Sequence, residues 1–208
     1  LAAELTEGSV TWLNYAYRLL HFPMGVFGVS LFMAALPKLS ELSTDKKAFE
    51  ATLHEAAGLS LFVSVGAAAG LFVFAEPILA LLFEHGRFTA FDVKQTAFAL
   101  QAYSLGLLAF NLNKIFSSAF FAVESMWTPA ILSLFSIVAN YFFSFFLSKK
   151  FGHAGIALSV SLTSLLTSIV LGLFLKSKGI GFSFLWSLRV LFGSILCAAP
   201  MGLFYYLE

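Results

Sequence analysis

Six long apolar stretches, separated by short charged or Gly/Pro-containing breaks, constrain the fold of this chain more than any other feature of its sequence. A helix needs about 20 mostly apolar residues to cross a bilayer. The stretches run approximately over residues 11–36, 54–83, 93–123, 129–147, 154–175 and 186–207. They are continuous, whereas strands of a membrane β-barrel are alternating segments of about ten residues. The sequence therefore predicts an all-α, polytopic transmembrane helical bundle of six spans, with residues 1–208 in a single transmembrane domain.

Composition excludes several other classes of protein. The chain is 60% apolar and only 11% charged, whereas a soluble domain carries roughly a quarter charged residues. Its formal net charge of +1 offers no basic surface for nucleic acid. The sequence contains no paired carboxylates, nucleophile motif, phosphate-binding glycine loop or His/Cys cluster with metal-ligand spacing. We therefore expect a membrane protein that is not an enzyme and has no cofactor or metal site.

The distribution of Lys and Arg predicts an orientation. The breaks after the first, third and fifth stretches carry a small excess of positive charge over the opposite side, and cytoplasmic loops are the ones enriched in such residues. This places the Lys38 to His54 loop in the cytoplasm and the start of the chain outside it. The two groups are Lys38, Lys46, Lys47, Lys176, Lys178 and Arg189 on one side, and Arg87, Lys94, Lys149 and Lys150 on the other.

A polar stripe marks the first apolar stretch. Arg18 lies about 10 Å of helix rise beyond the first member of the stripe, deeper than an ordinary end anchor. One interpretation is a cavity-facing cation that holds a phosphate or carboxylate through its planar guanidinium. The other is a guanidinium that reaches the interface or binds neighbouring carbonyl groups. The stripe consists of Thr11, Asn14, Arg18 and His21, and Gly25 and Gly28 extend the same line.

His21 and Pro23 add to this pattern. A histidine beside a cation in a wet cavity titrates near physiological pH, although His21 fits a neutral hydrogen-bonding role equally well. Pro23 removes a backbone donor and predicts a kink. A kink beside a polar stripe is typical of a gated cavity.

Further polar residues recur at helical spacing in the third and fourth stretches. Lys114 lies near the middle of its stretch, where a lysine is difficult to hide from lipid, which favours a water-filled or ligand-lined interior. Without a carboxylate, the serines and amides of the fourth stretch indicate hydrogen bonding between helices more than an ion site. The third stretch contributes Ser104, Asn111, Lys114 and Ser118, and the fourth contributes Ser133, Ser136, Asn140 and Ser144.

Four ordered blocks of sequence resemble a known family. They are GSVTWLNYAYRLLHFPMGVFGVSLFMAALPKLSEL (Gly8 to Leu42), AEPILALLFEHGRFTAFDV (Ala75 to Val93), AYSLGLLAFNLNKIFSSAFFA (Ala102 to Ala122) and FGHAGIALSVSL (Phe151 to Leu162), with a TP pair at Thr128 and Pro129 before the last. In this order and spacing they resemble the MurJ (MviN) family of lipid II flippases, within the multidrug/oligosaccharidyl-lipid/polysaccharide exporter superfamily.

The resemblance implies a multi-pass protein of the bacterial inner membrane with fourteen helices in two lobes around a central cavity. This chain resembles the eighth to thirteenth helices, so we expect a piece of a longer protein whose N-terminal lobe is its partner. The family moves undecaprenyl-pyrophosphate-linked peptidoglycan precursor, lipid II, across the membrane by alternating access, for cell-wall synthesis and cell shape. Arg18 matches the family's cavity arginine, Thr11 a polar position on the same helix, and Lys114 a lysine often found in the tenth helix.

The chain departs from the family pattern at three acidic positions. Tyr17 and His21 stand where the family has carboxylates around the cavity arginine, so a local Arg–carboxylate pair is missing. Some members bind sodium, and Asn140 matches one of its ligands, but Ser144 replaces the carboxylate four residues later. We therefore predict no sodium site.

The leading hypothesis is a flippase in which Arg18 is the main contact to the pyrophosphate. Asn14, Thr11, His21 and Lys114 join it in the substrate-binding set. Asn111, Asn140 and Ser144 are further candidate polar residues of the cavity. Two alternatives remain open at this point, namely a cation-coupled drug or polysaccharide exporter of the same superfamily and a membrane scaffold that does not transport.

Overall fold

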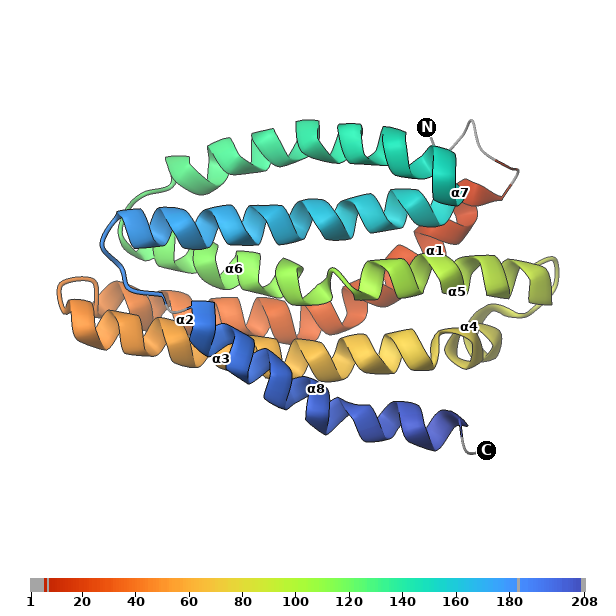
Figure 1. Cartoon of the computed structure of the whole chain (residues 1–208), viewed down its shortest axis with the longest axis horizontal. Helices are drawn as coiled ribbons and strands as arrows, with labels where there is room; N and C mark the ends of the chain where they lie inside the picture. Colours follow the sequence, from red (N-terminus) through yellow and green to blue (C-terminus); the bar gives the residue numbers. More distant parts are fainter. Residues whose placement is uncertain (1–5, 7, 183, 207–208) are drawn as a thin grey trace.

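The computed structural model describes residues 6, 8–182 and 184–206, and every regular element in this part of the chain is helical. This confirms the predicted all-α bundle (Figure 1). The elements are α1 (Ser9–Pro23), the π-helix η2 (Met24–Val29), α2 (Ser30–Glu41), α3 (Lys46–Val73), α4 (Ala75–Phe83), α5 (Ala90–Ser104), α6 (Leu107–Ala122), α7 (Trp127–Ser177) and α8 (Phe184–Tyr206).

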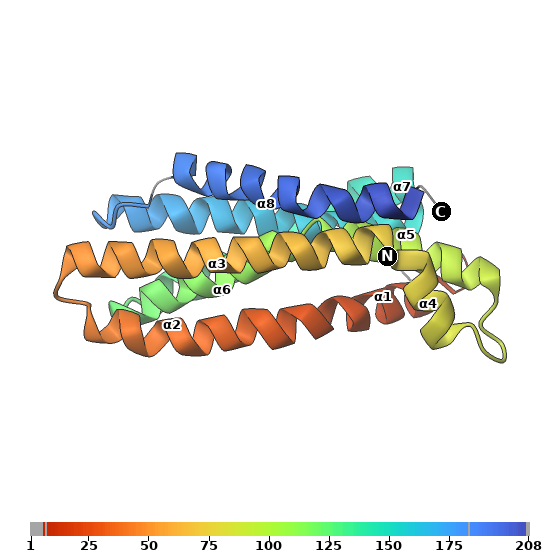
Figure 2. The ribbon, with the colours of Figure 1, turned by 90° about the horizontal axis from the view of Figure 1, so that it is seen from below.

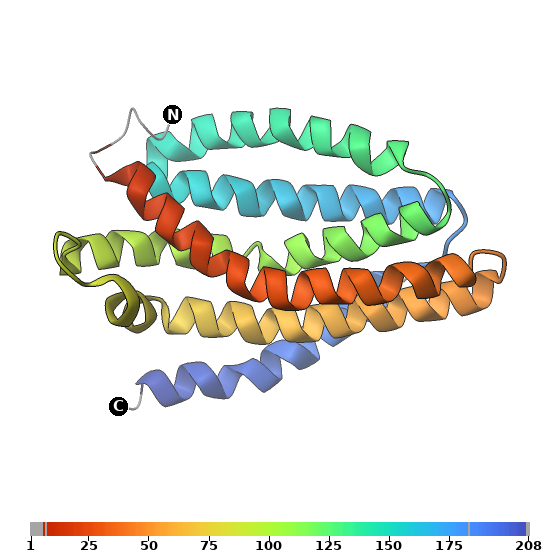
Figure 3. The ribbon, with the colours of Figure 1, turned by 180° about the vertical axis from the view of Figure 1, so that it is seen from behind.

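Within the described residues, four helical segments are long and apolar enough to cross a membrane: Ser9–Glu41, Lys46–Val73, Ala90–Ala122 and Trp127–Ser177. The last contains both the fourth and fifth predicted stretches, because α7 folds back on itself at Gly152 (φ 58°, ψ −135°). Figures 1 and 3 show its two halves running antiparallel. The sixth stretch coincides with α8.

The helices extend beyond the apolar stretches that hydropathy marks. The break predicted at residues 37–53 is only a short turn, since α2 ends at Glu41 and α3 begins at Lys46. The Asp45 carboxylate caps α3 by accepting a hydrogen bond from the backbone N–H of Ala48 (3.1 Å). Charged residues fit in the terminal turns because their long side chains reach outward into water.

The two groups of positive residues lie at opposite ends of the bundle. The α2–α3 turn, the α6–α7 connection and the end of α7 lie at one end of the bundle. The α4–α5 turn and the bend in α7 lie at the other end (Figures 1 and 2). Lys38 pairs with Glu55 (3.6 Å) at the first end. This separation agrees with the predicted sidedness, although which end is cytoplasmic stays a prediction.

The interior consists of two apolar clusters. One lies where α1, α4 and α5 meet, around the fully buried Leu20, Leu79 and Leu100. The other lies where α2, α3, α6 and the end of α7 meet, around Phe116 and Phe120. The first cluster holds α1 against α5, which fixes the side of α1 that faces outward.

Candidate functional site

The polar stripe of α1 lies on the face of the helix that turns away from the bundle. Thr11, Asn14, Arg18 and His21 are all exposed, whereas Leu20 on the opposite face is completely buried. Figure 3 shows α1 crossing the bundle with this outer side free of other described helices. The structure thus brings these four predicted residues together on one face.

No carboxylate of the described residues pairs with Arg18. Its guanidinium lies 5.7 Å from the centre of the Tyr15 ring, a cation–π contact. Asn14 and His21 instead satisfy their side chains within the helix: the Asn14 amide donates to the Val10 carbonyl (2.8 Å), and His21 Nδ1 bonds the Tyr17 carbonyl (3.0 Å). Among the described residues, the face therefore presents an arginine without a carboxylate partner between two side chains that are already hydrogen-bonded to the helix backbone.

Aromatic rings border the cation. The Tyr17 and His21 rings stack edge to face with centroids 4.1 Å apart. Tyr17 also lies 5.6 Å from the Tyr103 ring of α5, so it links this face to the bundle. The two positions that would carry acids in the family pattern thus hold rings packed on each other, and neither neutralises Arg18.

The stripe ends at η2, contrary to the expectation that Gly28 extends it. Gly25 is exposed, but Gly28 is buried against α6. A π-helix places one extra residue in the turn, which rotates the residues after it relative to those before it. Gly28 consequently faces the bundle interior, whereas Arg18 faces outward.

Lys114 and Asn111 lie on the inner side of this π-turn. The Lys114 amine donates to the Met24 carbonyl (3.2 Å), the first carbonyl of η2. Asn111 is almost completely buried, and its amide donates to Ser64 Oγ of α3 (2.8 Å). Lys114 therefore contacts η2, which directly follows the helix that carries Arg18, whereas Asn111 joins α6 to α3.

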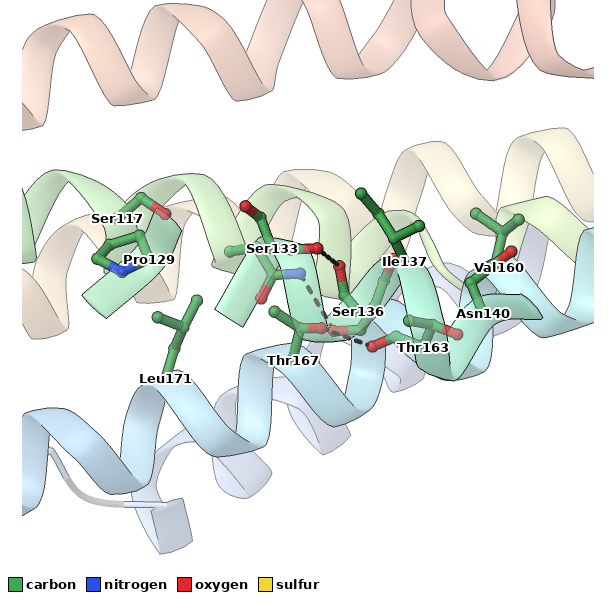
Figure 4. A pocket seen from close by; sticks show the side chains of 12 residues that line it. Ser117, Pro129, Ser133, Ser136, Ile137, Asn140, Val160, Thr163, Thr167 and Leu171 are labelled. Atoms are coloured by element: carbon green, nitrogen blue, oxygen red, sulfur yellow. Dashed lines mark hydrogen bonds between the residues drawn. The ribbon is translucent and has the colours of Figure 1, made fainter. Parts of the chain in front are cut away.

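Asn140 and Ser144 belong to a separate polar region between α6 and the two halves of α7. Ser144 Oγ lies 2.5 Å from Ser159 Oγ and donates to Asn140 Oδ1 (3.4 Å). Asn140 borders a pocket of about 480 Å³, and hydroxyl groups from both halves of α7 face it (Figure 4). The polar residues that line it are Asn113, Ser117, Ser133, Ser136, Asn140, Thr163, Ser164 and Thr167.

The side chains that line this pocket carry no formal charge, and none of them is a carboxylate. Ser144 bonds Asn140 but does not itself line the pocket. Among the described residues no cluster of three or more His, Cys, Asp or Glu could hold a metal ion. We assign no ion to this region.

Sequence reasoning missed two partners in these contacts. Ser64 lies in an apolar run of α3, and nothing in that run indicates that it accepts from Asn111. The Met24 carbonyl is backbone, which a residue pattern cannot mark. Asn113, which donates to the Ser164 carbonyl (3.1 Å), was missed as well. Its position beside Asn111 and Lys114 in the NLNK segment could have marked it as a polar interior residue.

The structure defines the class of the protein: it is a polytopic α-helical membrane protein. Its membrane-length helices carry an exposed arginine and line a polar pocket. Comparison with known proteins gives the family. The sequence model described as "Lipid II flippase MurJ" matches residues 1–208, so the chain belongs to that family and the resemblance is confirmed.

Relatives and a solved structure agree with this assignment. The chain is 41% identical over 169 residues to the probable lipid II flippase MurJ of Buchnera aphidicola, covering 80% of this chain and 33% of the relative. It is 34% identical over 182 residues to the lipid II flippase MurJ of Burkholderia cenocepacia, covering 86% and 35%. A solved lipid II flippase MurJ in an inward closed conformation matches with a TM-score of 0.79 and 27% identity, covering 97% of this chain and 46% of that one.

The chain thus spans about a third of the length of these two relatives. Family membership and the membrane-length helices make it a multi-pass protein of the bacterial inner membrane.

Proposed function

We propose that the protein containing this chain flips lipid II, the lipid-linked peptidoglycan precursor, across the inner membrane by alternating access. In this proposal the chain forms most of the C-terminal lobe and one wall of the cavity, and the N-terminal lobe supplies the other wall. The activity is transport and not catalysis. The observation that carries the proposal is the exposed Arg18 guanidinium on the outward face of α1, which has no carboxylate partner among the described residues.

The chemistry of Arg18 suits the most polar part of this substrate. A pyrophosphate carries several acceptor oxygens and negative charge, and a guanidinium binds such oxygens through two parallel hydrogen bonds. Arg18 has no carboxylate partner among the described residues of this chain. A charge-assisted hydrogen bond is worth about 1.5–3 kcal/mol, or roughly a tenfold to hundredfold change in affinity.

Neighbouring residues complete the proposed site. Thr11 and Asn14 lie on the same exposed face. Their side chains can donate hydrogen bonds to phosphate oxygens, and they can donate to or accept from the hydroxyl groups of the sugars. His21 borders Arg18 on the side of the π-turn, and Lys114, bonded to the Met24 carbonyl on the inner side of that turn, adds a second positive charge from α6. We place Asn111, Asn140 and Ser144 behind this surface, as polar residues that join its helices.

Complementation by the full-length protein tests the proposal. Arg18→Ala should fail to restore growth in a strain depleted of its lipid II flippase, because the cation is lost. Arg18→Lys should restore growth only partly, since an ammonium keeps the charge but loses the bidentate geometry. Arg189→Ala is the matched control, because Arg189 is an exposed arginine of α8, a helix that packs against α3.

Full rescue by Arg18→Ala at normal protein levels would exclude Arg18 as the pyrophosphate contact. Rescue that depended on a cation gradient and not on Arg18 would instead favour the cation-coupled exporter. A scaffold without transport is excluded if wild-type protein restores lipid II movement in the depleted strain.

A further inference from the structure

The first membrane-length segment, Ser9–Glu41, changes direction at the π-helix η2. Figure 3 shows α1 leaving the line of α2 at this point. The π-turn begins directly after Pro23, which has no N–H to donate to the preceding turn. Such turns are rare and occur frequently at functional sites.

The spacing of the buried residues shows that the turn contains one extra residue. Along α1 the buried positions Ala16, Leu20 and Pro23 follow one another at the three- and four-residue spacing of an α-helix. The next buried position is Gly28, five residues after Pro23. Since each α-helical residue turns by about 100°, the one-residue offset rotates the face of α1 by about that angle relative to α2. The π-turn therefore determines where Arg18 points.

Three elements meet at this turn through polar contacts. The Lys114 amine of α6 donates to the Met24 carbonyl (3.2 Å). Gly28 approaches α6 so closely that a Cβ there would lie 2.1 Å from Asn111 Oδ1 and 3.2 Å from Lys114 Nζ. Asn111 in turn donates to Ser64 of α3 (2.8 Å). A side chain at position 28 would require the Asn111 amide to move if η2 kept this position.

The contact also explains how a lysine is accommodated at mid-helix. An ammonium group within a membrane helix needs a partner, and carbonyl oxygens are among the partners that such groups find. No carboxylate of the described residues pairs with Lys114. The carbonyl at the start of the π-turn is the partner that the structure gives it, so the amine and the π-turn stabilise one another.

We propose that Lys114 is a positioning residue for Arg18. Its amine holds the π-turn through the Met24 carbonyl, and the turn fixes the rotation of α1 and hence the direction of the guanidinium. This inference rests on the proposed function and adds to it: Lys114 acts on lipid II through the geometry of α1 as well as through its charge.

Distances between spin labels in the full-length protein test this role. In a cysteine-free background, labels at the exposed positions Phe22 on α1 and Leu59 on α3 report on the helix before the turn. Labels at Met33 on α2 and Leu59 report on the helix after it. We expect Lys114→Met to shift or broaden the first distance distribution and to leave the second unchanged. Lys114→Arg, which keeps a donor for the carbonyl, should restore the first distribution.

Lipid II binding is measured on the same variants. Lys114→Met should weaken binding of purified lipid II by about tenfold, and Lys114→Arg should recover most of that loss. If Lys114→Met does not fold, Lys114→Leu, which also lacks a donor for the Met24 carbonyl, replaces it and the same comparison applies. A first distribution identical to that of the wild type overturns the positioning role, as does an equal change in both distributions, which shows general unfolding.

The two proposals can fail separately. If Arg18→Ala abolishes lipid II binding while Lys114→Met leaves α1 in place, the positioning role is wrong and the flippase assignment stands. If Lys114→Met moves α1 while neither variant affects lipid II binding, Lys114 does hold the turn, but the role of Arg18 in the proposed function is wrong.

Discussion

The hairpin within α7 requires a glycine at position 155, and replacing it should destabilise the protein strongly. A Cβ at Gly155 would lie 2.2 Å from the Leu147 carbonyl oxygen and 2.5 Å from its carbon. That is about 1 Å less than ordinary contact between non-bonded atoms. The obstructing atoms are backbone, so they cannot rotate away as the end of a side chain can. Overpacking of this kind costs about 1–3 kcal/mol.

Gly152, at the bend itself, adds a backbone contribution. Its φ of 58° with ψ of −135° lies in a region that residues with a Cβ rarely adopt. An alanine held there costs about 1–3 kcal/mol. We expect Gly155→Ala and Gly152→Ala each to lower the unfolding temperature of the full-length protein in detergent, and the double variant to lower it further.

Gly66→Ala is the matched control. Gly66 lies inside α3, and a Cβ there meets no atom within 4 Å. Alanine favours a helix by about 1 kcal/mol over glycine, so this variant should unfold at the same temperature as the wild type or higher. If Gly155→Ala has the same unfolding temperature as Gly66→Ala, the two halves of α7 do not approach as closely as the structure shows.

Three further outcomes are expected. Trp12→Phe should lower the free energy of unfolding by about 1.5–3 kcal/mol, because the indole N–H donates to the Asp92 carboxylate (2.9 Å); Trp127→Phe, at a ring that is 80% exposed, should have little effect. The 208-residue chain alone, reconstituted in vesicles, should move no labelled lipid II, because in the proposed function it supplies only one wall of the cavity; transport at the full-length rate would contradict this. Cysteines placed at positions 14 and 18 of the full-length protein should react with a water-soluble maleimide, and unreactive cysteines would indicate a packed scaffold.

Much of the fold could be predicted from the sequence because hydropathy acts locally. Runs of apolar residues marked the helical stretches, and the i, i+3, i+7 spacing placed Thr11, Asn14 and Arg18 on one face, as the structure shows. The bounds were less predictable. Lys46 and Asp45 look like loop residues by charge, yet Asp45 is an N-cap and Lys46 begins α3.

The contacts that decide orientation lie far apart in the sequence and could not be predicted. Lys114 bonds a backbone carbonyl 90 residues earlier, and no side-chain pattern identifies a carbonyl. Pro23 indicated a kink, but not that the turn would be a π-helix, and so Gly28 was expected on the outer stripe. Its burial depends on the approach of α6, which a single helix does not encode.

Protection of position 14 by substrate tests the central claim most directly. Asn14→Cys in the full-length protein retains Arg18 and lies one helical turn from it on the same exposed face. We predict that purified lipid II slows the reaction of this cysteine with a water-soluble maleimide, while a cysteine at the exposed position Lys47, in the first turn of α3, reacts at an unchanged rate. Equal reaction of Asn14→Cys with and without saturating lipid II would show that the substrate does not contact this face, and would contradict the proposed function of Arg18.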